Sequence, residues 1–324
     1  MHRMLPLKIV GTGTYLPPAV ETSADVGARI GRSAKWIESR TGVKTRHRSE
    51  LPMEEMAAIA ARAALGDGGK PDLILNASGV PRQTVPDSSV YVQRALGWEG
   101  IPSFTIHATC ISFVVALHTA AHFLQAGTYR RILIVSADRG TVGRNFEQPE
   151  SASLLGDAAA AVVVELPGDG EENGLLGFKL ESYPSGADLT TIKGGGTFLH
   201  PNDPRVTPAD NLFAMHGTRV FRMARKIMPE FCRSHYRDLG LGVEDYTLCI
   251  PHQTSQRGVM AYKFADFTED KIFSMVESVG NTVGTAIPLA LVTAADEGRI
   301  VRGDLVFLVG TGAGLSCVGL TLRW

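Results

Sequence analysis

The sequence predicts an α/β fold, and three patterns support this prediction. Short runs rich in Val, Ile and Leu have the composition of strands that are buried on both faces of a sheet. Longer segments with helical periodicity separate these runs, and such alternation is typical of α/β proteins. The order of strand-like runs in the first half of the chain also recurs in the second half. We therefore expect two related α/β halves.

The predicted strands are short and are bounded by polar or turn-forming residues. They cover residues 8–10, 72–76, 131–136, 160–165, 246–250 and 304–309. The segment 72–79 resembles 246–253, and 131–135 resembles 304–308, which is the basis for expecting two related halves.

The predicted helices lie between these strands. They cover residues 54–65, 88–96, 110–126, 212–238, 254–265 and 284–297. The stretch 167–174 is acidic and rich in turn-forming residues, so we place a boundary there, between residues 1–168 and 169–324. The region 186–211 contains several prolines and a Gly-Gly-Gly run. It lacks the ending of a phosphate-binding P-loop, and we expect a surface loop.

The overall composition is that of an ordinary globular protein. Its 324 residues are 44% hydrophobic, and 32 Lys and Arg balance 33 Asp and Glu, for a formal net charge of −1. Such a balance provides no general field for binding nucleic acid or an anionic membrane, although a local basic rim is compatible with it. The apolar run 158–164 is far too short to span a bilayer, and the first residues do not resemble a secretory signal. We expect a cytoplasmic protein.

The four cysteines are scattered along the chain, which argues against a disulfide framework and against a four-thiolate zinc site. Cys232 with His235, and His118 with His122, have spacings that a metal could use, but each pair lacks an evident further ligand. We expect reduced thiols and no metal.

Cys110 lies between an extended run at 103–107 and an apolar helical stretch. A thiol at a helix N-terminus meets the positive end of the helix dipole, which favours the reactive thiolate. The arrangement of strand, turn, cysteine and helix therefore indicates a nucleophile. A small buried core residue is the alternative interpretation.

Two further polar residues follow a strand or precede a helix. His252 follows the predicted strand 246–250, at the carboxyl edge where ligand sites of α/β sheets gather. Asn281 lies in a glycine-flanked turn ahead of the helix 284–297. Taken singly, His252 could be a packed or capping histidine and Asn281 a simple turn residue.

Together these elements resemble the ketosynthase III family, the 3-oxoacyl-[acyl-carrier-protein] synthase III-like enzymes of the thiolase superfamily. The resemblance runs nearly from end to end. Besides Cys110, the His of Pro-His-Gln at 251–253 and the Asn of Gly-Asn-Thr at 280–282, it includes WIESRTGV at 36–43, LLGD at 154–157 and GTGAG at 310–314. Each motif is short, but their order and spacing make chance agreement improbable.

The resemblance implies a five-layered αβαβα thiolase-like fold made of two pseudo-duplicated halves, generally as a homodimer. It implies that an acyl group from acyl-CoA is loaded on Cys110 and condensed with a malonyl thioester, carried by CoA or by an acyl carrier protein, in a decarboxylative Claisen reaction. His252 and Asn281 would stabilise the enolate as neutral donors. The backbone N–H groups of Cys110 and Ala313 would hold the oxyanion. No cofactor beyond these substrates is implied.

The same resemblance assigns binding roles to five more residues. Trp36 and Arg40 correspond to stacking and phosphate contacts with the adenine end of CoA, and Arg257 to an arginine at the mouth where acyl carrier protein docks. Val85 corresponds to a position that closes the acyl pocket of the partner subunit, and Leu155 to an acyl-pocket residue. Because Val85 is smaller than the usual aromatic residue, we expect the pocket to admit groups larger than acetyl.

Several positions depart from the pattern of the chain-initiating enzymes. The residues around the nucleophile are TCISF in place of ACAGF, and Ala158 begins AAA in place of GAG. Pro149 and Ser255 stand where CoA-contacting Arg and Asn residues are expected, and Cys317 replaces a tryptophan. These departures favour a specialised acyl or polyketide pathway over primary fatty-acid initiation.

Three alternatives remain at this stage. The chain order Cys, His, Asn also occurs in papain-like hydrolases, although their local signature is absent here. The same fold could transfer the acyl group to an alcohol or amine, with His252 as general base and no decarboxylation. A non-catalytic partner subunit would not need an intact Cys110, His252 and Asn281.

Overall fold

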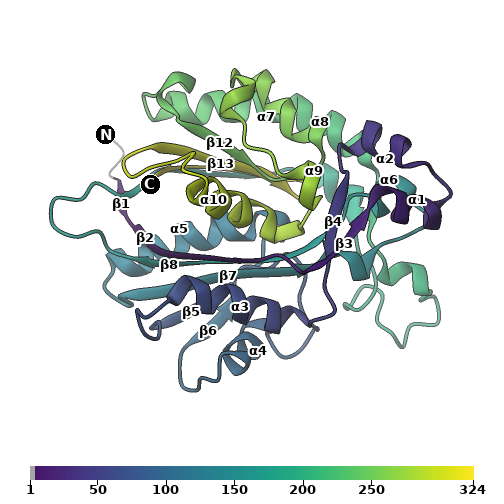
Figure 1. Cartoon of the computed structure of the whole chain (residues 1–324), viewed down its shortest axis with the longest axis horizontal. Helices are drawn as coiled ribbons and strands as arrows, with labels where there is room; N and C mark the ends of the chain where they lie inside the picture. Colours follow the sequence, from purple (N-terminus) through teal and green to yellow (C-terminus); the bar gives the residue numbers. More distant parts are fainter. Residues whose placement is uncertain (1–3) are drawn as a thin grey trace.

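Two five-stranded sheets are stacked, with helices between them and on both outer faces (Figure 1). This computed structural model describes residues 4–324. The central layer contains α5 (Ser112–Gln125) and α10 (Ala286–Asp296), whereas α3 (Met53–Leu65) and α7 (Gly217–Asp238) lie on opposite outer faces. This is the five-layered αβαβα fold that the sequence led us to expect.

The first sheet has the strand order β2-β8-β7-β5-β6. β8 is antiparallel to both β2 and β7, whereas β5 is parallel to both β7 and β6. β7 and β8 are buried along almost their whole length because helices cover both faces of the sheet. The strands are β2 (Lys8–Tyr15), β5 (Leu73–Asn76), β6 (Ser103–Thr105), β7 (Arg131–Arg139) and β8 (Asp157–Glu165).

The second sheet, with the order β1-β9-β14-β13-β12, repeats this pattern. The pairing directions of β9, β14, β13 and β12 are those of β2, β8, β7 and β5. A parallel bridge between Cys249 and Ile272 takes the place of β6. The predicted correspondences thus match β5 with β12 and β7 with β13. The strands are β1 (Leu5–Pro6), β9 (Gly174–Ser182), β12 (Leu248–Pro251), β13 (Leu305–Gly312) and β14 (Ser316–Arg323).

The predicted boundary after residue 168 lies in the connection between β8 and β9. The start of the chain crosses this boundary, because Leu5 pairs with Leu175 and Pro6 with Gly174. Cutting the chain at residue 168 would therefore remove β1 from the second sheet. The division into 1–168 and 169–324 stays a prediction.

The two central helices join the halves into one core. α5 and α10 are apolar on nearly all sides, as helices between two sheets must be. Phe113 and Leu117 from α5 and Leu291 from α10 belong to one buried cluster with residues of both sheets. Burying one such side chain contributes about 1.5–3 kcal/mol. Because the core is shared, the segments leading into α5 and α10 have fixed relative positions.

Three predicted helices differ in detail from the structure. The segment 110–126 consists of a 3₁₀ turn, Thr109–Ile111, followed by α5. The segment 254–265 is divided into α8 (Gln256–Val259) and a 3₁₀ stretch, Met260–Ala265. The helix predicted from 212 begins at Gly217, because the preceding residues form β11 (Ala214–Met215).

The region 186–211 is mostly irregular, as expected, but it includes β10 (Thr190–Thr191), which pairs with β11. No helix within residues 4–324 is both long and apolar enough to cross a membrane. The remaining elements are short: β3 (Ala19–Thr22), α1 (Ser23–Ile30), α2 (Ala34–Thr41), β4 (Thr45–Arg48), α4 (Ser88–Ala95), α6 (Pro149–Ala152) and α9 (Val276–Val279), with 3₁₀ turns at Gly140–Gly143, Pro184–Leu189, Pro208–Asn211, Val243–Asp245, Glu269–Lys271 and Val283–Thr285.

Candidate active site

A cavity of about 510 Å³ brings together residues from four distant stretches of the chain. Cys110 comes from the turn before α5, His252 from the end of β12, Asn281 from the loop after α9, and Ala313 from the turn between β13 and β14. All four line this one cavity. The structure thus places the three predicted catalytic side chains and one predicted oxyanion donor around a shared space.

The nucleophile candidate Cys110 lies in a strained turn. The preceding residue, Thr109, has φ of 54°, in the left-handed region that a β-branched residue rarely adopts. Such strain concentrates at functional sites, where the surrounding structure enforces it. The neighbouring chain is close as well, since a Cβ at Gly312 would lie 2.5 Å from Thr109 Oγ1.

The electrostatic environment of Cys110 differs from the one that the sequence indicated. Burial, together with the nearby Asp138 carboxylate, raises the pKa of the Cys110 thiol to about 12. The helix-dipole argument predicted a stabilised thiolate, whereas burial favours the neutral thiol. The backbone N–H groups of Cys110 and Ala313 act in the opposite direction, lowering the pKa of the thiol. These two donors therefore lie close to the sulfur, as an oxyanion site requires.

Asp138, at the end of β7, is a buried residue that sequence reasoning missed. Its carboxylate accepts hydrogen bonds from the N–H groups of Gly79 and Val80 at 2.9 Å each, and from the N–H of Thr285 at 3.0 Å. It thereby connects a loop of the first half to the start of α10. Burial raises the pKa of the Asp138 carboxyl to about 6. A polar residue at the carboxyl end of a predicted buried strand was the available signal.

His252 is held at the end of β12 by the backbone and by close packing. The backbone N–H of His252 donates to the backbone carbonyl of Val309 at 2.8 Å. Gly310 lies directly against it, because a Cβ at that position would be 2.8 Å from His252 Cβ. The histidine is 4% exposed, and burial lowers the pKa of its imidazole to about 4. His252 is therefore neutral near pH 7, in keeping with the neutral donor that the sequence predicted.

Asn281 is positioned by backbone hydrogen bonds on both sides. The backbone N–H of Asn281 donates to the backbone carbonyl of Leu154 at 2.8 Å. The backbone carbonyl of Asn281 accepts from the Gly156 N–H at 3.0 Å. Its side-chain oxygen accepts from the Val283 N–H at 2.9 Å. Val283 has φ of 56°, a second strained β-branched residue beside the site.

Four arginines line the cavity. Arg40 and Arg257, both singled out in the sequence, line it together with Arg222 and Arg225 of α7. The guanidinium of Arg225 lies 4.4 Å from the ring centre of Phe264. Arg222 and Arg225 were missed, although three-residue spacing on the predicted helix 212–238 was a signal that they share a face.

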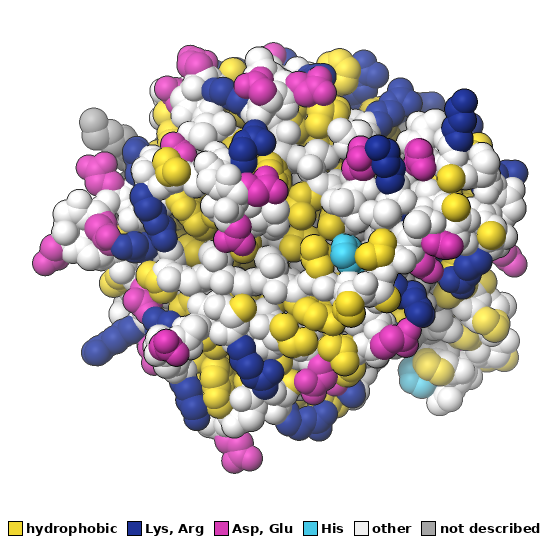
Figure 2. Space-filling model, viewed as in Figure 1, with side chains coloured by type: hydrophobic (Ala, Val, Ile, Leu, Met, Phe, Trp, Pro, Cys, Tyr) yellow, Lys and Arg dark blue, Asp and Glu magenta, His cyan; other side chains and the backbone are white. Residues whose placement is uncertain are grey.

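The concentration of positive charge in the four arginines that line the cavity is local. Figure 2 shows Lys and Arg interspersed with Asp and Glu over the face in view, in agreement with the net charge of −1. Arg40 forms an ion pair with Glu150 at 3.0 Å, and both side chains are exposed. Trp36 does not line the cavity, but its ring centre lies 5.5 Å from the Arg40 guanidinium. Trp36 is thus next to a lining residue without itself lining the cavity.

The two predicted acyl-pocket residues lie outside this cavity. Val85 is 77% exposed on the surface of the chain, and Leu155 is buried behind the cavity wall. Leu154 lines the cavity in its place, with other apolar side chains: Leu189, Phe213, Met215, Met228 and Leu315. A pocket that used Leu155 or Val85 would have to extend past the present wall or belong to another subunit. Their acyl-pocket roles stay predictions.

Within residues 4–324 no three His, Cys, Asp or Glu side chains are arranged to hold a metal ion. All four cysteines are free thiols; Cys232, Cys249 and Cys317 are buried, and Cys110, on the cavity wall, is partly buried.

Comparison with solved structures agrees with this architecture. The crystal structure of 3-oxoacyl-(acyl carrier protein) synthase III from Pseudomonas aeruginosa PAO1 has a TM-score of 0.87 and 32% sequence identity, with 98% of each chain covered. The five-layered fold, with cysteine, histidine and asparagine on one cavity, defines the class as thiolase-fold condensing enzymes. Beta-ketoacyl-[acyl-carrier-protein] synthase III of Desulfitobacterium hafniense is 32% identical over 328 residues, which cover 99% of this chain and 98% of the relative. The chain belongs to the 3-oxoacyl-[acyl-carrier-protein] synthase III family.

Further matches support this membership. The enzyme of the same name from Geobacillus kaustophilus is 33% identical over 323 residues, which cover 98% of both chains. Residues 104–184 match the family model for 3-oxoacyl-[acyl-carrier-protein (ACP)] synthase III, and residues 237–324 match the model of its C-terminal part. The resemblance found in the sequence is thereby confirmed.

Proposed function

We propose that this protein is an acyltransferase of the β-ketoacyl synthase III type, in class EC 2.3.1. It loads an acyl group from acyl-CoA on Cys110 and condenses it with a malonyl thioester, with loss of carbon dioxide. The observation that carries the proposal is the convergence of Cys110, a neutral His252 and Asn281 on one cavity.

The first half-reaction is the transfer of the acyl group to sulfur. Because burial raises the pKa of the Cys110 thiol, we propose that Cys110 loses its proton as it attacks the thioester carbonyl. A bond forms between sulfur and the acyl carbon, and negative charge moves to the carbonyl oxygen. The N–H groups of Cys110 and Ala313 are the donors that receive this charge. The bond to the CoA sulfur then breaks, and the departing thiolate takes up the proton.

The second half-reaction requires a carbanion. Loss of carbon dioxide from the malonyl group leaves negative charge on the thioester oxygen as an enolate. The neutral imidazole of His252 and the NH₂ group of Asn281 are two uncharged donors suited to that oxygen. The enolate carbon then attacks the acyl carbon on Cys110, the bond between sulfur and the acyl carbon breaks, and the departing thiolate takes a proton from water. No further cofactor takes part in this scheme.

The shape and charge of the cavity suit a long thioester with an anionic end. Gly217 and Pro229 of α7 both line it, and twelve residues of helix span about 18 Å. Arg40, Arg222, Arg225 and Arg257 line the cavity and could pair with the phosphates of CoA or of a carrier protein's prosthetic group. We propose these residues as the anchor for acyl-CoA and for the malonyl donor, with Trp36 at the outer end.

We also propose a homodimer, because exposed apolar side chains lie on the edge strand of the first sheet and on the segments that precede it. β6 is the edge strand within the described residues, and Phe104 in β6 is 37% exposed. Val90 and Val85, which precede β6 in the chain, are 42% and 77% exposed. Free edges with apolar side chains favour pairing with a second copy. Light scattering would show the dimer mass, and a monomer at micromolar concentration would refute this part.

The cytoplasm is the proposed location, since a reducing compartment keeps four free thiols unpaired. The acyl-CoA that the enzyme prefers distinguishes fatty-acid initiation from a specialised acyl or polyketide route.

The experiment that tests the function follows both half-reactions in sequence. Purified enzyme is first acylated with acetyl-CoA or a longer acyl-CoA, and then receives malonyl-CoA or a malonyl carrier protein. The proposal predicts release of one carbon dioxide per acyl group consumed, with a β-ketoacyl thioester as the product. Loss of the acyl group to an added alcohol or amine, without gas release, would show transfer without decarboxylation.

A further inference from the structure

The segment Ser153–Asp157 determines where Asn281 lies. Leu155 and Asn281 form an isolated parallel bridge, and the Leu154 carbonyl accepts the Asn281 N–H at 2.8 Å. Asn281 belongs to neither a helix nor a strand of a sheet. The position of its carboxamide in the cavity therefore depends on the position of the 153–157 segment.

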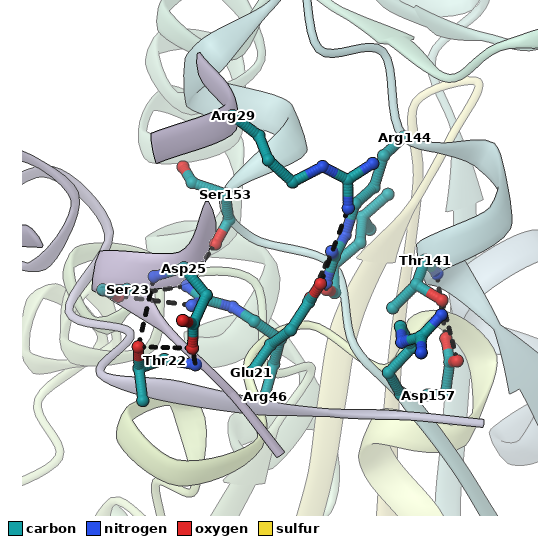
Figure 3. Close-up of polar contacts among 12 residues, drawn as sticks. Glu21, Thr22, Ser23, Asp25, Arg29, Arg46, Thr141, Arg144, Ser153 and Asp157 are labelled. Carbon is teal, nitrogen blue, oxygen red and sulfur yellow. Dashed lines mark hydrogen bonds and ion pairs between the residues drawn. The ribbon is translucent and has the colours of Figure 1, made fainter. Parts of the chain in front are cut away.

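Two buried arginines donate to carbonyl groups of this segment. Arg46 donates from Nη2 to the Ser153 carbonyl at 2.7 Å, as Figure 3 shows. Arg144 donates from Nη2 to the Leu155 carbonyl at 2.6 Å. The accepting carbonyls flank that of Leu154, which accepts from Asn281. Arg46 is 0% and Arg144 is 3% exposed, so both bonds are shielded from water.

Burying two guanidinium groups side by side is costly, and this cost calls for an explanation. Burial, together with repulsion from Arg144, lowers the pKa of Arg46 to about 10. Arg144 is paired with Glu21 at 2.5 Å, but no carboxylate of the described residues lies within ion-pair distance of Arg46. The remaining hydrogen bonds of Arg46 go to the Ser23 hydroxyl at 3.2 and 3.3 Å.

The base of the Arg46 side chain also packs where the 153–157 segment meets the loop that contains Asn281. A Cβ built at Gly156 would lie 3.3 Å from Arg46 Cβ, and a Cβ at Gly280 would lie 3.6 Å from it. Gly280 has φ of +68°, where other residues are strained. The base of the Arg46 side chain therefore lies against one glycine from each of the two joined segments.

The far end of the segment is fixed separately. The Asp157 carboxylate accepts from the N–H and the hydroxyl of Thr141, each at 2.8 Å (Figure 3). It also accepts from the N–H of Ser49 at 2.8 Å. The segment is thus held at both ends and at two of its carbonyls in between.

We propose that Arg46 and Arg144 are positioning residues for the Asn281 carboxamide. They hold the Ser153–Asp157 segment in the register that presents the NH₂ group of Asn281 to the malonyl thioester. Neither arginine lines the cavity, so neither touches substrate. This inference rests on the proposed function, because it concerns the half-reaction in which Asn281 acts.

The test compares the two half-reactions in Arg144→Gln. The rate of carbon dioxide release by pre-acylated enzyme at saturating malonyl-CoA should fall about 10- to 100-fold, as expected for a displaced catalytic group. The rate of Cys110 acylation by acetyl-CoA should stay within about twofold of wild type, since Asn281 takes no part in it. Arg144→Lys keeps the pairing with Glu21 and should recover part of the loss. Arg302→Gln is the matched control, because Arg302 donates to the Ile9 carbonyl at 2.8 Å and lies outside the cavity.

Hydrogen exchange provides a readout that does not depend on catalysis. Peptides covering 153–157 and 279–283 should exchange faster in Arg144→Gln, with little change elsewhere. If Arg144→Gln does not fold, the two half-reactions and the hydrogen exchange are compared in Arg144→Lys and Arg46→Lys instead. Equal losses in both half-reactions, or unchanged exchange at 279–283, would overturn the proposal. Acylated wild type that releases no carbon dioxide would instead contradict the proposed function, and the exchange result would still decide whether the arginines hold Asn281.

Discussion

The side-chain oxygen of Asn281 accepts a hydrogen bond from the backbone N–H of Val283 at 2.9 Å. Since a backbone N–H can only donate, this bond fixes the orientation of the carboxamide and leaves its NH₂ group for another partner. The strained φ of 56° at Val283 is part of the turn that makes the bond possible. The arrangement presents a donor, rather than an acceptor, to an oxygen that gains negative charge.

Replacing this donor by an acceptor should separate the two half-reactions. In Asn281→Asp the carboxylate would repel an enolate oxygen and would also favour the charged form of His252. We expect carbon dioxide release from the malonyl thioester to fall about 100- to 1000-fold. Acylation of Cys110, followed by intact mass, should be nearly unchanged. Comparable losses in both steps would argue against a role confined to the enolate.

The pH dependence of decarboxylation should reflect the buried state of His252. Burial lowers the pKa of this imidazole to about 4, so the neutral donor persists from pH 8 down to about pH 5 and is lost only as the pH falls through 4. In the unfolded chain the imidazole takes up its proton near pH 6.5, so its contribution to stability declines between about pH 6.5 and 4. Stopped-flow rates of decarboxylation should show no inflection near 6.5. An inflection there that disappears in His252→Ala would refute a neutral buried histidine.

Gly310 should be intolerant of even one added methyl group. In Gly310→Ala the new Cβ would lie 2.8 Å from His252 Cβ, and neither atom can rotate away. We expect a loss of about 1–3 kcal/mol in the free energy of unfolding, and a larger loss in decarboxylation than in acylation. Gly143→Ala is the control, because a Cβ there meets nothing within 4 Å. Thermal melts and the two half-reaction assays distinguish the variants, and equal behaviour of both would contradict the packing argument.

The arginines that line the cavity should affect substrate binding without changing the rate of the chemical steps. Arg225→Gln removes a charge that lines the cavity, and we expect the KM for acetyl-CoA to rise about 3- to 10-fold with kcat little changed. Arg219→Gln, on the same helix but outside the cavity lining, should leave KM nearly constant. Raising the salt concentration should reduce the difference between wild type and Arg225→Gln. A salt-independent difference, or an equal effect at Arg219, would exclude this role.

The fold could be predicted well where a pattern had one physical cause. Apolar runs such as 131–136 and 160–165 are strands buried under helices on both faces, and the recurrence of 72–76 as 246–250 reflects the repeated sheet. β9 was missed because most of its residues beyond Leu175 are only partly buried, and residues such as Gly177 and Glu181 interrupt the apolar signal. The crossing of β1 into the second sheet was also missed, since two residues carry too little pattern to show a partner.

The site was predictable in its residue types but not in its electrostatics. Cys110, His252 and Asn281 each follow a strand or precede a helix, and the structure brings them to one cavity. The helix-dipole argument did not predict the raised pKa of Cys110, because it considered the dipole alone. Burial and the charge of Asp138, a residue of β7, also act on the thiol. The roles of Arg46 and Arg144 depend on hydrogen bonds to carbonyl groups more than ten residues away in sequence. No local pattern encodes such contacts.

Intact-mass spectrometry after incubation with acyl-CoA, followed by peptide mapping, tests the central assignment most directly. The account predicts one added acyl mass per chain, located on the peptide that contains Cys110, and no added mass in Cys110→Ala. An adduct of equal yield in Cys110→Ala, or one mapped to Cys232, Cys249 or Cys317, would contradict it.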